Sequence, residues 1–246
     1  MSFRAQLAHA ERVNRSLLCV GLDPDPSRFP GAMKNDPAQI FDFCSAIVDA
    51  TRDLVIAYKP QIAYFAAHGA EAQLERLIAY IHDSAPDVPV ILDAKRGDMG
   101  STAEQYAKEV FDRYRADAVT LSPLLGFDSI EPYLRHAGKG VILLCRTSNP
   151  GGADLQDLRL ASGEKLYEHI ATLATTEWNR GGEIGLVVYF ALAIESLYPF
   201  PVIRGRNSQA PYTLAVDTIR RTASRLRGPL AKAVRHSAAL TPATSP

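Results

Sequence analysis

The sequence has few cysteines and no excess of charge of either sign. It contains three cysteines among 246 residues, and Cys19 and Cys145 lie inside apolar runs. This pattern predicts buried thiols in a reducing compartment and argues against a disulfide framework. Basic and acidic residues number 27 each. The chain therefore has no net charge that would attract it to nucleic acid or to a membrane surface.

Long hydrophobic segments and metal-ligand patterns are also missing. The first residues, MSFRAQLAHAERVNRS, lack the apolar region of a signal peptide, and no run approaches membrane-spanning length. We therefore expect a cytoplasmic protein with no membrane partner. The six histidines show no spacing typical of zinc ligands, so we expect no metal site.

Short apolar runs are abundant and alternate with longer amphipathic segments. The runs are rich in Val, Ile and Leu with little alternation, which is typical of strands covered on both faces. Strand–helix alternation of this kind predicts a parallel sheet. The predicted strands are 16–23, 54–60, 88–95, 116–123, 140–148, 184–190 and 200–205, and the clearest helical patterns are 38–52, 69–83, 102–115 and 163–179.

Polar residues at the ends of these runs favour a closed (βα)8 TIM-type barrel over an open sheet. In a barrel the C-terminal strand ends converge on one mouth, where active sites form. We expect a single barrel domain over residues 1–236, incomplete or distorted around strands 7 and 8, followed by a disordered tail at 237–246.

One run, VPVILDAKRGDMGSTAEQYA, ends in a dense cluster of charges. Residues i and i+2 of a strand share a face, so Asp93 and Lys95 are expected side by side at the strand end. Gly97 would let the chain turn, and Asp98 would project from the loop. A lysine held between two carboxylates keeps its proton. It would therefore serve as a positioned acid and not as a Schiff-base nucleophile. A solvated loop network is the alternative interpretation.

The following helix has its own expected start signal. Ser101 is predicted to cap it, with Glu104 three residues later completing a capping box.

The cluster and five further segments resemble the longer bacterial branch of the orotidine 5'-phosphate decarboxylase family. They occur in the family's order and cover residues 1–188. The segments are LDAKRGDMGST, LLCVGLDPDPSRFP, AYKPQIAYFAAHGAE, ADAVTLSPLLGFDSIEPY, LLCRTSNPGGADLQDL and GLVV.

This resemblance implies a cofactor-free enzyme that removes CO2 from orotidine 5'-phosphate to give uridine 5'-phosphate. Lys95 corresponds to the lysine that protonates C6, and Asp93 to the carboxylate that faces the substrate carboxylate. Asp98 and Thr102 match residues that the family lends across a homodimer interface to the neighbouring subunit's site.

The resemblance also implies contacts to the bound nucleotide. Asp23 and Lys59 match residues that bind the ribose hydroxyls, and Ser122 matches a pyrimidine contact. From the residues alone, Asp23 before Pro24 fits a turn cap equally well.

Beyond Val188 the chain departs from the family pattern. Gln209 keeps a family position, but Arg206 and Pro211 stand where the family has small residues or glycine, and a proline removes one amide from an anion cradle. Arg235 would be the phosphate-binding arginine. Divergence, loss of function and an altered reading frame would each produce this pattern.

The segment after residue 203 is also basic, with eight Lys or Arg and one acid. A helix at 214–227 with one solvated arginine face explains this charge more simply than RNA binding. We therefore expect no nucleic-acid partner.

Two other functions remain open at this point. One is a metal-dependent phosphosugar lyase of the same superfamily, against which Lys59-Pro60-Gln61 and TSNPG argue. The other is a catalytically impaired barrel that binds nucleotide.

Overall fold

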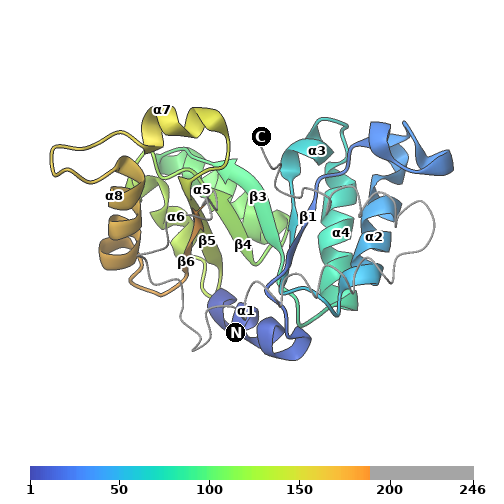
Figure 1. Ribbon diagram of the computed structural model, residues 1–246. Coiled ribbons are helices and arrows are strands. Elements are labelled where there is room, and N and C mark those ends of the chain that lie inside the picture. Colours follow the sequence, from blue (N-terminus) through green and yellow to red (C-terminus); the bar gives the residue numbers. More distant parts are fainter. Residues whose placement is uncertain (189–246) are drawn as a thin grey trace, which may run out of the picture. The chain divides into compact units, whose positions relative to one another are not determined.

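The computed structural model describes residues 1–188 (Figure 1). They fall into two compact units, which we call the 6–90 unit (Gln6–Val90) and the 91–188 unit (the residues from Ile91 on, together with Met1–Ala5). Several predictions fall outside the described residues: the run 200–205, the distorted region of strands 7 and 8, the helix 214–227, the tail 237–246, Gln209 and Arg235.

The 6–90 unit contains two parallel strands and their helices. Strand β1 (Cys19–Leu22) pairs with β2 (Ala57–Pro60), with Cys19 opposite Ala57 and Leu22 opposite Pro60. The long helices α2 and α4 pack side by side (Figure 1). The helices are α1 (Phe3–Asn14, which begins in the other unit), α2 (Ile40–Thr51), α3 (Ile62–Ala66) and α4 (Glu71–Ser84).

The core of this unit follows from helical periodicity. On α4 the residues Leu74, Leu77, Ile78 and Ile81 are fully buried, and their i, i+3, i+4, i+7 spacing puts them on one helix face. The strand side contributes the buried Tyr58, whose hydroxyl lies 3.0 Å from the carbonyl of Val48 on α2 and 2.7 Å from the Thr51 hydroxyl.

The 91–188 unit is built on a parallel sheet with the strand order β3-β4-β5-β6. All four residues of β4 are buried, as expected for a central strand covered on both faces. Two helices continue into π-helical turns, at Glu109–Arg113 and Ala174–Trp178. The strands are β3 (Ile91–Arg96), β4 (Ala118–Leu121), β5 (Gly140–Arg146) and β6 (Ile184–Val188), and the helices are α5 (Gly100–Lys108), α6 (Glu131–Leu134), α7 (Ala153–Gln156) and α8 (Leu166–Leu173).

A glycine lets the N-terminus pack on this sheet. A Cβ at Gly140, the first residue of β5, would overlap the ring of Phe3, which is itself buried. Only a residue without a side chain allows this close approach.

The predicted α/β class is confirmed, because each predicted strand from 16–23 to 184–190 overlaps an observed parallel strand. Within residues 1–188 the strands form a two-stranded and a four-stranded sheet. No closed barrel is recorded for this part of the chain. In the same range, none of the helices combines the length and the apolar character that crossing a membrane would require.

Two local predictions are wrong. The helix α5 starts at Gly100, which has φ +58°, so Ser101 lies inside the first turn and no side chain caps the helix. Cys19 is exposed, whereas Cys44 and Cys145 are buried. Its strand β1 pairs with one strand, β2, among the described residues.

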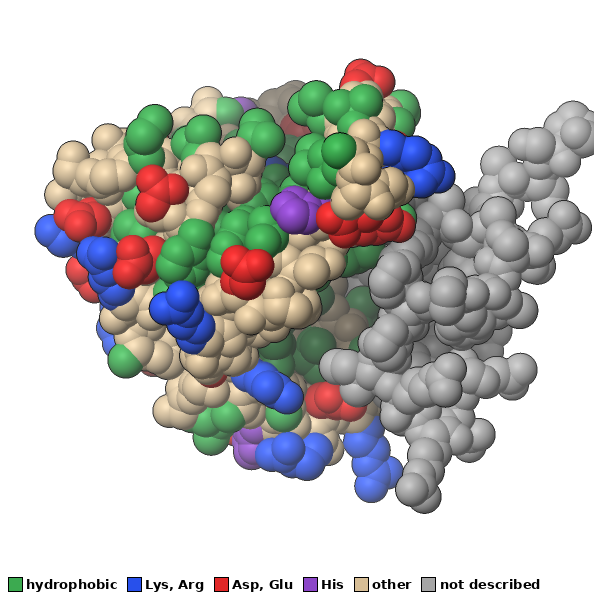
Figure 2. Space-filling model, turned by 90° about the vertical axis from the view of Figure 1, so that its left-hand side faces the viewer, with side chains coloured by type: hydrophobic (Ala, Val, Ile, Leu, Met, Phe, Trp, Pro, Cys, Tyr) green, Lys and Arg blue, Asp and Glu red, His purple; other side chains and the backbone are tan. Residues whose placement is uncertain are grey.

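The surface agrees with the balanced composition. On the face in Figure 2, basic and acidic side chains are interspersed, and no large area of one sign gathers there.

Candidate active site at the end of β3

The charged cluster forms where β3 leaves regular pairing with β4. Ile91 pairs with Ala118 and Leu92 with Val119, but the next pair is Arg96 with Leu121. Asp93, Ala94 and Lys95 therefore lie opposite Thr120 alone. Lys95 has a left-handed backbone, with φ +47°. Bulges of this kind redirect side chains and are common beside active sites.

The bulge brings Asp93 and Lys95 into contact. The Lys95 ammonium lies 2.7 Å from Oδ1 of Asp93, and the two side chains are 48% and 9% exposed. The same oxygen accepts a hydrogen bond from the Thr120 hydroxyl at 2.8 Å. A nearly buried carboxylate is thus paired with a cation that solvent and a ligand can reach. A buried charge needs such partners.

Thr120 also binds the backbone of the bulge. Its hydroxyl oxygen accepts hydrogen bonds from the N–H groups of Ala94 and Lys95, at 3.1 and 3.0 Å. Sequence reasoning missed this residue. It lies in the apolar run of 116–123, where a β-branched residue is typical of any buried strand.

Arg96, the last residue of β3, connects the strand end to the following helix. Its guanidinium forms an ion pair with Glu109 at 2.8 Å and lies 4.4 Å from the ring centroid of Tyr106. Both partners belong to α5 and its π-helical extension, so the strand end is tied to the helix that follows it. Burial raises the pKa of Tyr133, with the Arg96 charge opposing the shift.

The remaining predicted residues of this unit follow the strand ends: Asp98 lies in the loop after β3, Thr102 on α5, and Ser122 directly after β4. The N–H of Ser122 donates to the Arg96 carbonyl at 2.7 Å, and a Cβ at Gly97 would stand 3.1 Å from Cβ of Ser122. A side chain at position 97 would therefore require the loop or Ser122 to shift by a few tenths of an ångström. The Asp98 carboxylate accepts a hydrogen bond from the N–H of Met99 at 2.9 Å, and Thr102 is exposed in the first turn of α5.

Asp23 and Lys59 belong to the 6–90 unit. Asp23 directly follows β1 and is exposed, and Lys59 is half-buried in β2. Gly21 and Leu22 pair with Lys59 and Pro60. The two residues therefore lie at the C-terminal ends of adjacent parallel strands, as the sequence predicted.

Arg146, at the end of β5, anchors the next loop. Its guanidinium forms an ion pair with Asp157 at 2.9 Å, and Lys165 lies 3.3 Å from the same carboxylate. Gln156 accepts a hydrogen bond from the N–H of Thr147 at 2.8 Å. These contacts close the 147–157 segment on itself.

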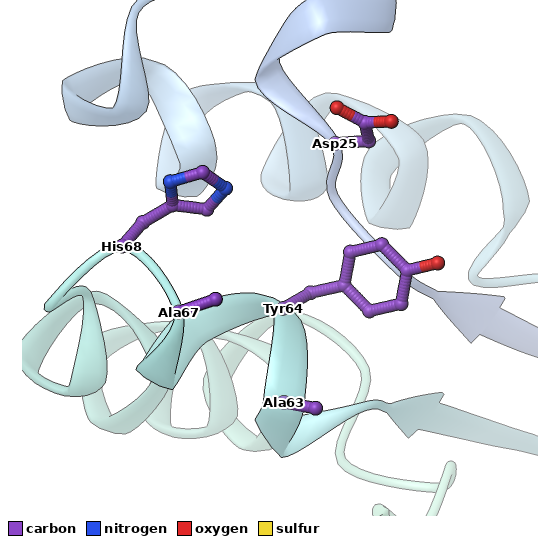
Figure 3. A pocket seen from close by; sticks show the side chains of 5 residues that line it. All are labelled: Asp25, Ala63, Tyr64, Ala67 and His68. Atoms are coloured by element: carbon purple, nitrogen blue, oxygen red, sulfur yellow. The ribbon is translucent and has the colours of Figure 1, made fainter.

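The 6–90 unit also contains a shallow pocket of about 300 Å³ beside α3, and Figure 3 shows the side chains around it. Among the described residues, none of the predicted site residues lines it. Hydrogen bonds from the hydroxyl and N–H of Ser27 lower the pKa of Asp25. The lining residues are Asp25, Ala63, Tyr64, Ala67 and His68.

In each unit, charged side chains lie at the C-terminal ends of parallel strands, which is where enzymes of the α/β-barrel class carry their active sites. The model of the orotidine 5'-phosphate decarboxylase / HUMPS family matches residues 16–196. The chain belongs to this family.

Curated relatives and solved structures agree. The chain is 68% identical over 210 residues to an orotidine 5'-phosphate decarboxylase of Leptothrix cholodnii, covering 84% of this chain and 72% of that protein. It is 71% identical over 191 residues to the corresponding protein of Methylibium petroleiphilum, covering 76% and 69%. The solved Leishmania donovani OMP decarboxylase matches with a TM-score of 0.68 and 42% identity, over 76% of this chain and 70% of that one. The fold is therefore the predicted TIM-barrel fold.

Proposed function

We propose that this chain catalyses the cofactor-free decarboxylation of orotidine 5'-phosphate to uridine 5'-phosphate, a step of pyrimidine synthesis, in the cytoplasm. The observation that carries the proposal is the Asp93–Lys95 ion pair at the end of β3, in a chain that belongs to this family. The phosphosugar lyase alternative is not favoured, because the relatives named above are decarboxylases of orotidine 5'-phosphate.

The chemistry needs a proton donor that is already in place. When the bond between C6 and the carboxylate breaks, its electron pair stays on C6 and CO2 leaves. The Lys95 ammonium gives its proton to C6, and the neutral amine is reprotonated from solvent. A preorganised cation at the developing negative charge contributes several kcal/mol to such a step. No cofactor takes part in these proposed steps.

Asp93 has two roles in this proposal. Its nearly buried carboxylate fixes the Lys95 ammonium at 2.7 Å. It also faces the substrate carboxylate, whose negative charge disappears as CO2 departs. Repulsion between the two carboxylates is relieved along the reaction, so it favours the transition state over the ground state.

The rest of the nucleotide would be held by residues on several elements. Asp23 and Lys59 bind the ribose hydroxyls, and Ser122 contacts the pyrimidine. In this proposal Arg235 binds the phosphate and Gln209 contacts the substrate, and both residues lie outside the described part of the chain. The impaired nucleotide-binding alternative depends on that same segment.

We also propose a homodimer with shared sites. Asp98 lies in the loop that follows β3, and Thr102 is exposed on α5. Each would enter the site of the neighbouring subunit. A mixture of Lys95→Ala and Asp98→Ala subunits would then contain hybrid dimers with one intact site.

Loss of orotidine 5'-phosphate absorbance, followed with the purified full chain, tests the function. Turnover no higher than that of the Lys95→Ala variant would reject it. Restored activity on mixing the two inactive variants tests the shared site. If the mixture stays as inactive as its components, the exchange of residues between subunits is rejected while the function stands.

A further inference from the structure

Thr120 occupies an unusual position opposite the charged cluster. Across the bulge, three residues of β3 face this one residue of β4. Its hydroxyl contacts each of them, namely the carboxylate of Asp93 and the N–H groups of Ala94 and Lys95.

These contacts use the full hydrogen-bonding capacity of the hydroxyl. A threonine hydroxyl has one hydrogen to donate and two lone pairs to accept. The hydrogen goes to Oδ1 of Asp93 at 2.8 Å, and the lone pairs receive the two amides at 3.1 and 3.0 Å. At 3% exposure, Thr120 leaves little room for water to substitute.

The contacts bear directly on the proton donor. The N–H groups of Ala94 and Lys95 converge on one oxygen, with Lys95 in the left-handed region at φ +47°. That backbone turn sets the direction in which the Lys95 side chain leaves the strand. The carboxylate that receives the Thr120 hydrogen is the one that holds the Lys95 ammonium at 2.7 Å. One hydroxyl thus fixes the backbone amide of Lys95 directly and its ammonium through Asp93.

We infer that Thr120 is a positioning residue that builds the bulge and so presents the Lys95 ammonium to the reacting carbon. The inference rests on the proposed decarboxylase function. Thr120 does not touch the substrate in this account. It acts through Asp93 and through the backbone of Ala94 and Lys95.

Thr120→Val removes the hydroxyl and keeps the shape of the side chain. We expect kcat to fall about 10- to 100-fold, the range reached when a reacting group is displaced by about 1 Å. KM should change less than about 3-fold, because the lost interaction acts in the transition state. Thr120→Ser, which keeps the hydroxyl, should stay within about 3-fold of the parent in kcat.

Thr51→Val is the matched control. Thr51 is also buried, at 2% exposure, and its hydroxyl contacts the Ile47 carbonyl and the Tyr58 hydroxyl. This variant loses a buried hydroxyl elsewhere, so it should lower the melting temperature and leave kcat unchanged. If Thr120→Val lowers kcat no more than Thr51→Val, the inference is overturned.

If the Thr120→Val variant does not fold, two further measurements still test the inference. Thr120→Cys keeps a small polar side chain with weak hydrogen bonding, so its kcat should fall well below that of Thr120→Ser. Equal kcat values for these two variants overturn the inference.

Hydrogen exchange at the amides of Ala94 and Lys95 tests the bulge without activity. The amides should be protected in the parent and in Thr120→Ser and exchange faster in Thr120→Cys. Equal exchange in all three overturns the inference. A parent protein without turnover would reject the proposed function, and the exchange comparison would still decide the role of the hydroxyl.

Discussion

The Asp93 carboxylate and the Lys95 ammonium are 2.7 Å apart but differ sharply in exposure, 9% against 48% for the two side chains. The carboxylate is fixed in the protein interior, and the ammonium is exposed toward solvent. A ligand can therefore approach the ammonium without displacing its partner.

Replacing Lys95 by alanine should abolish turnover. It removes the proton donor, and general acid catalysis with electrostatic stabilisation together account for a loss of at least about 10³-fold in kcat. Lys139→Ala is the matched control in the same unit. Lys139 also pairs with an acid, Asp117, at 3.5 Å, and it lies outside the proposed site. Steady-state assays should show normal turnover for this control. Residual Lys95→Ala activity near the parent level would contradict the mechanism.

Gly97→Ala should impair turnover through the backbone. The added Cβ would stand 3.1 Å from Cβ of Ser122, so the loop or β4 must shift. We expect kcat to fall about 10-fold or more, because a small displacement of reacting groups is costly. Gly181→Ala, where a Cβ meets nothing within 4 Å, should behave as the parent. Equal kinetics for both variants would show that the close approach is not needed.

Thiol labelling should distinguish the three cysteines. Cys19 is exposed, and Cys44 and Cys145 are buried. Burial also raises the pKa of Cys44 to about 12 and that of Cys145 to about 11. Reactivity requires an accessible thiolate, so one thiol should react rapidly in the native protein and two only after unfolding. Mass spectrometry of labelled peptides identifies which cysteine has reacted. Rapid native labelling of Cys44 would contradict the buried assignment.

The same pKa shift predicts alkaline destabilisation. Above the ordinary pKa of 9.0, the unfolded Cys44 thiol loses its proton, while the native thiol keeps it until about pH 12. The unfolded state then binds fewer protons, so the free energy of unfolding falls as pH rises, by at most about 1.4 kcal/mol per pH unit for this group. Below pH 9 the term is constant.

Urea unfolding between pH 7 and 11 measures this effect. Cys44→Ala should show a shallower decline than the parent. If the free energy of unfolding falls equally with pH in the parent and in Cys44→Ala, the Cys44 thiol is not the source of the decline.

The sequence predicted the strands because apolar runs report burial directly, and it predicted the meeting of Asp93 and Lys95 from their spacing. It could not predict how they meet. A bulge depends on which residues face each other across two strands, and no local pattern encodes that register. Thr120 and the Arg96–Glu109 pair were missed for this reason, since each role exists only after β3, β4 and α5 come together. At Ser101 the local pattern predicted a feature that the structure does not have. The sequence there fits a capping box, but the helix begins one residue earlier, at Gly100, and no side chain caps it.

The left-handed backbone of Lys95 has a consequence for how this position can vary. A residue with a Cβ loses about 1–2 kcal/mol in this conformation, and glycine does not. Lys95→Gly should therefore melt at a higher temperature than Lys95→Ala, and both variants lack the proposed proton donor. Both variants also lose the ammonium that pairs with the nearly buried Asp93 carboxylate, so both should melt below the parent, and the difference between the two variants isolates the free-energy cost of the backbone angle.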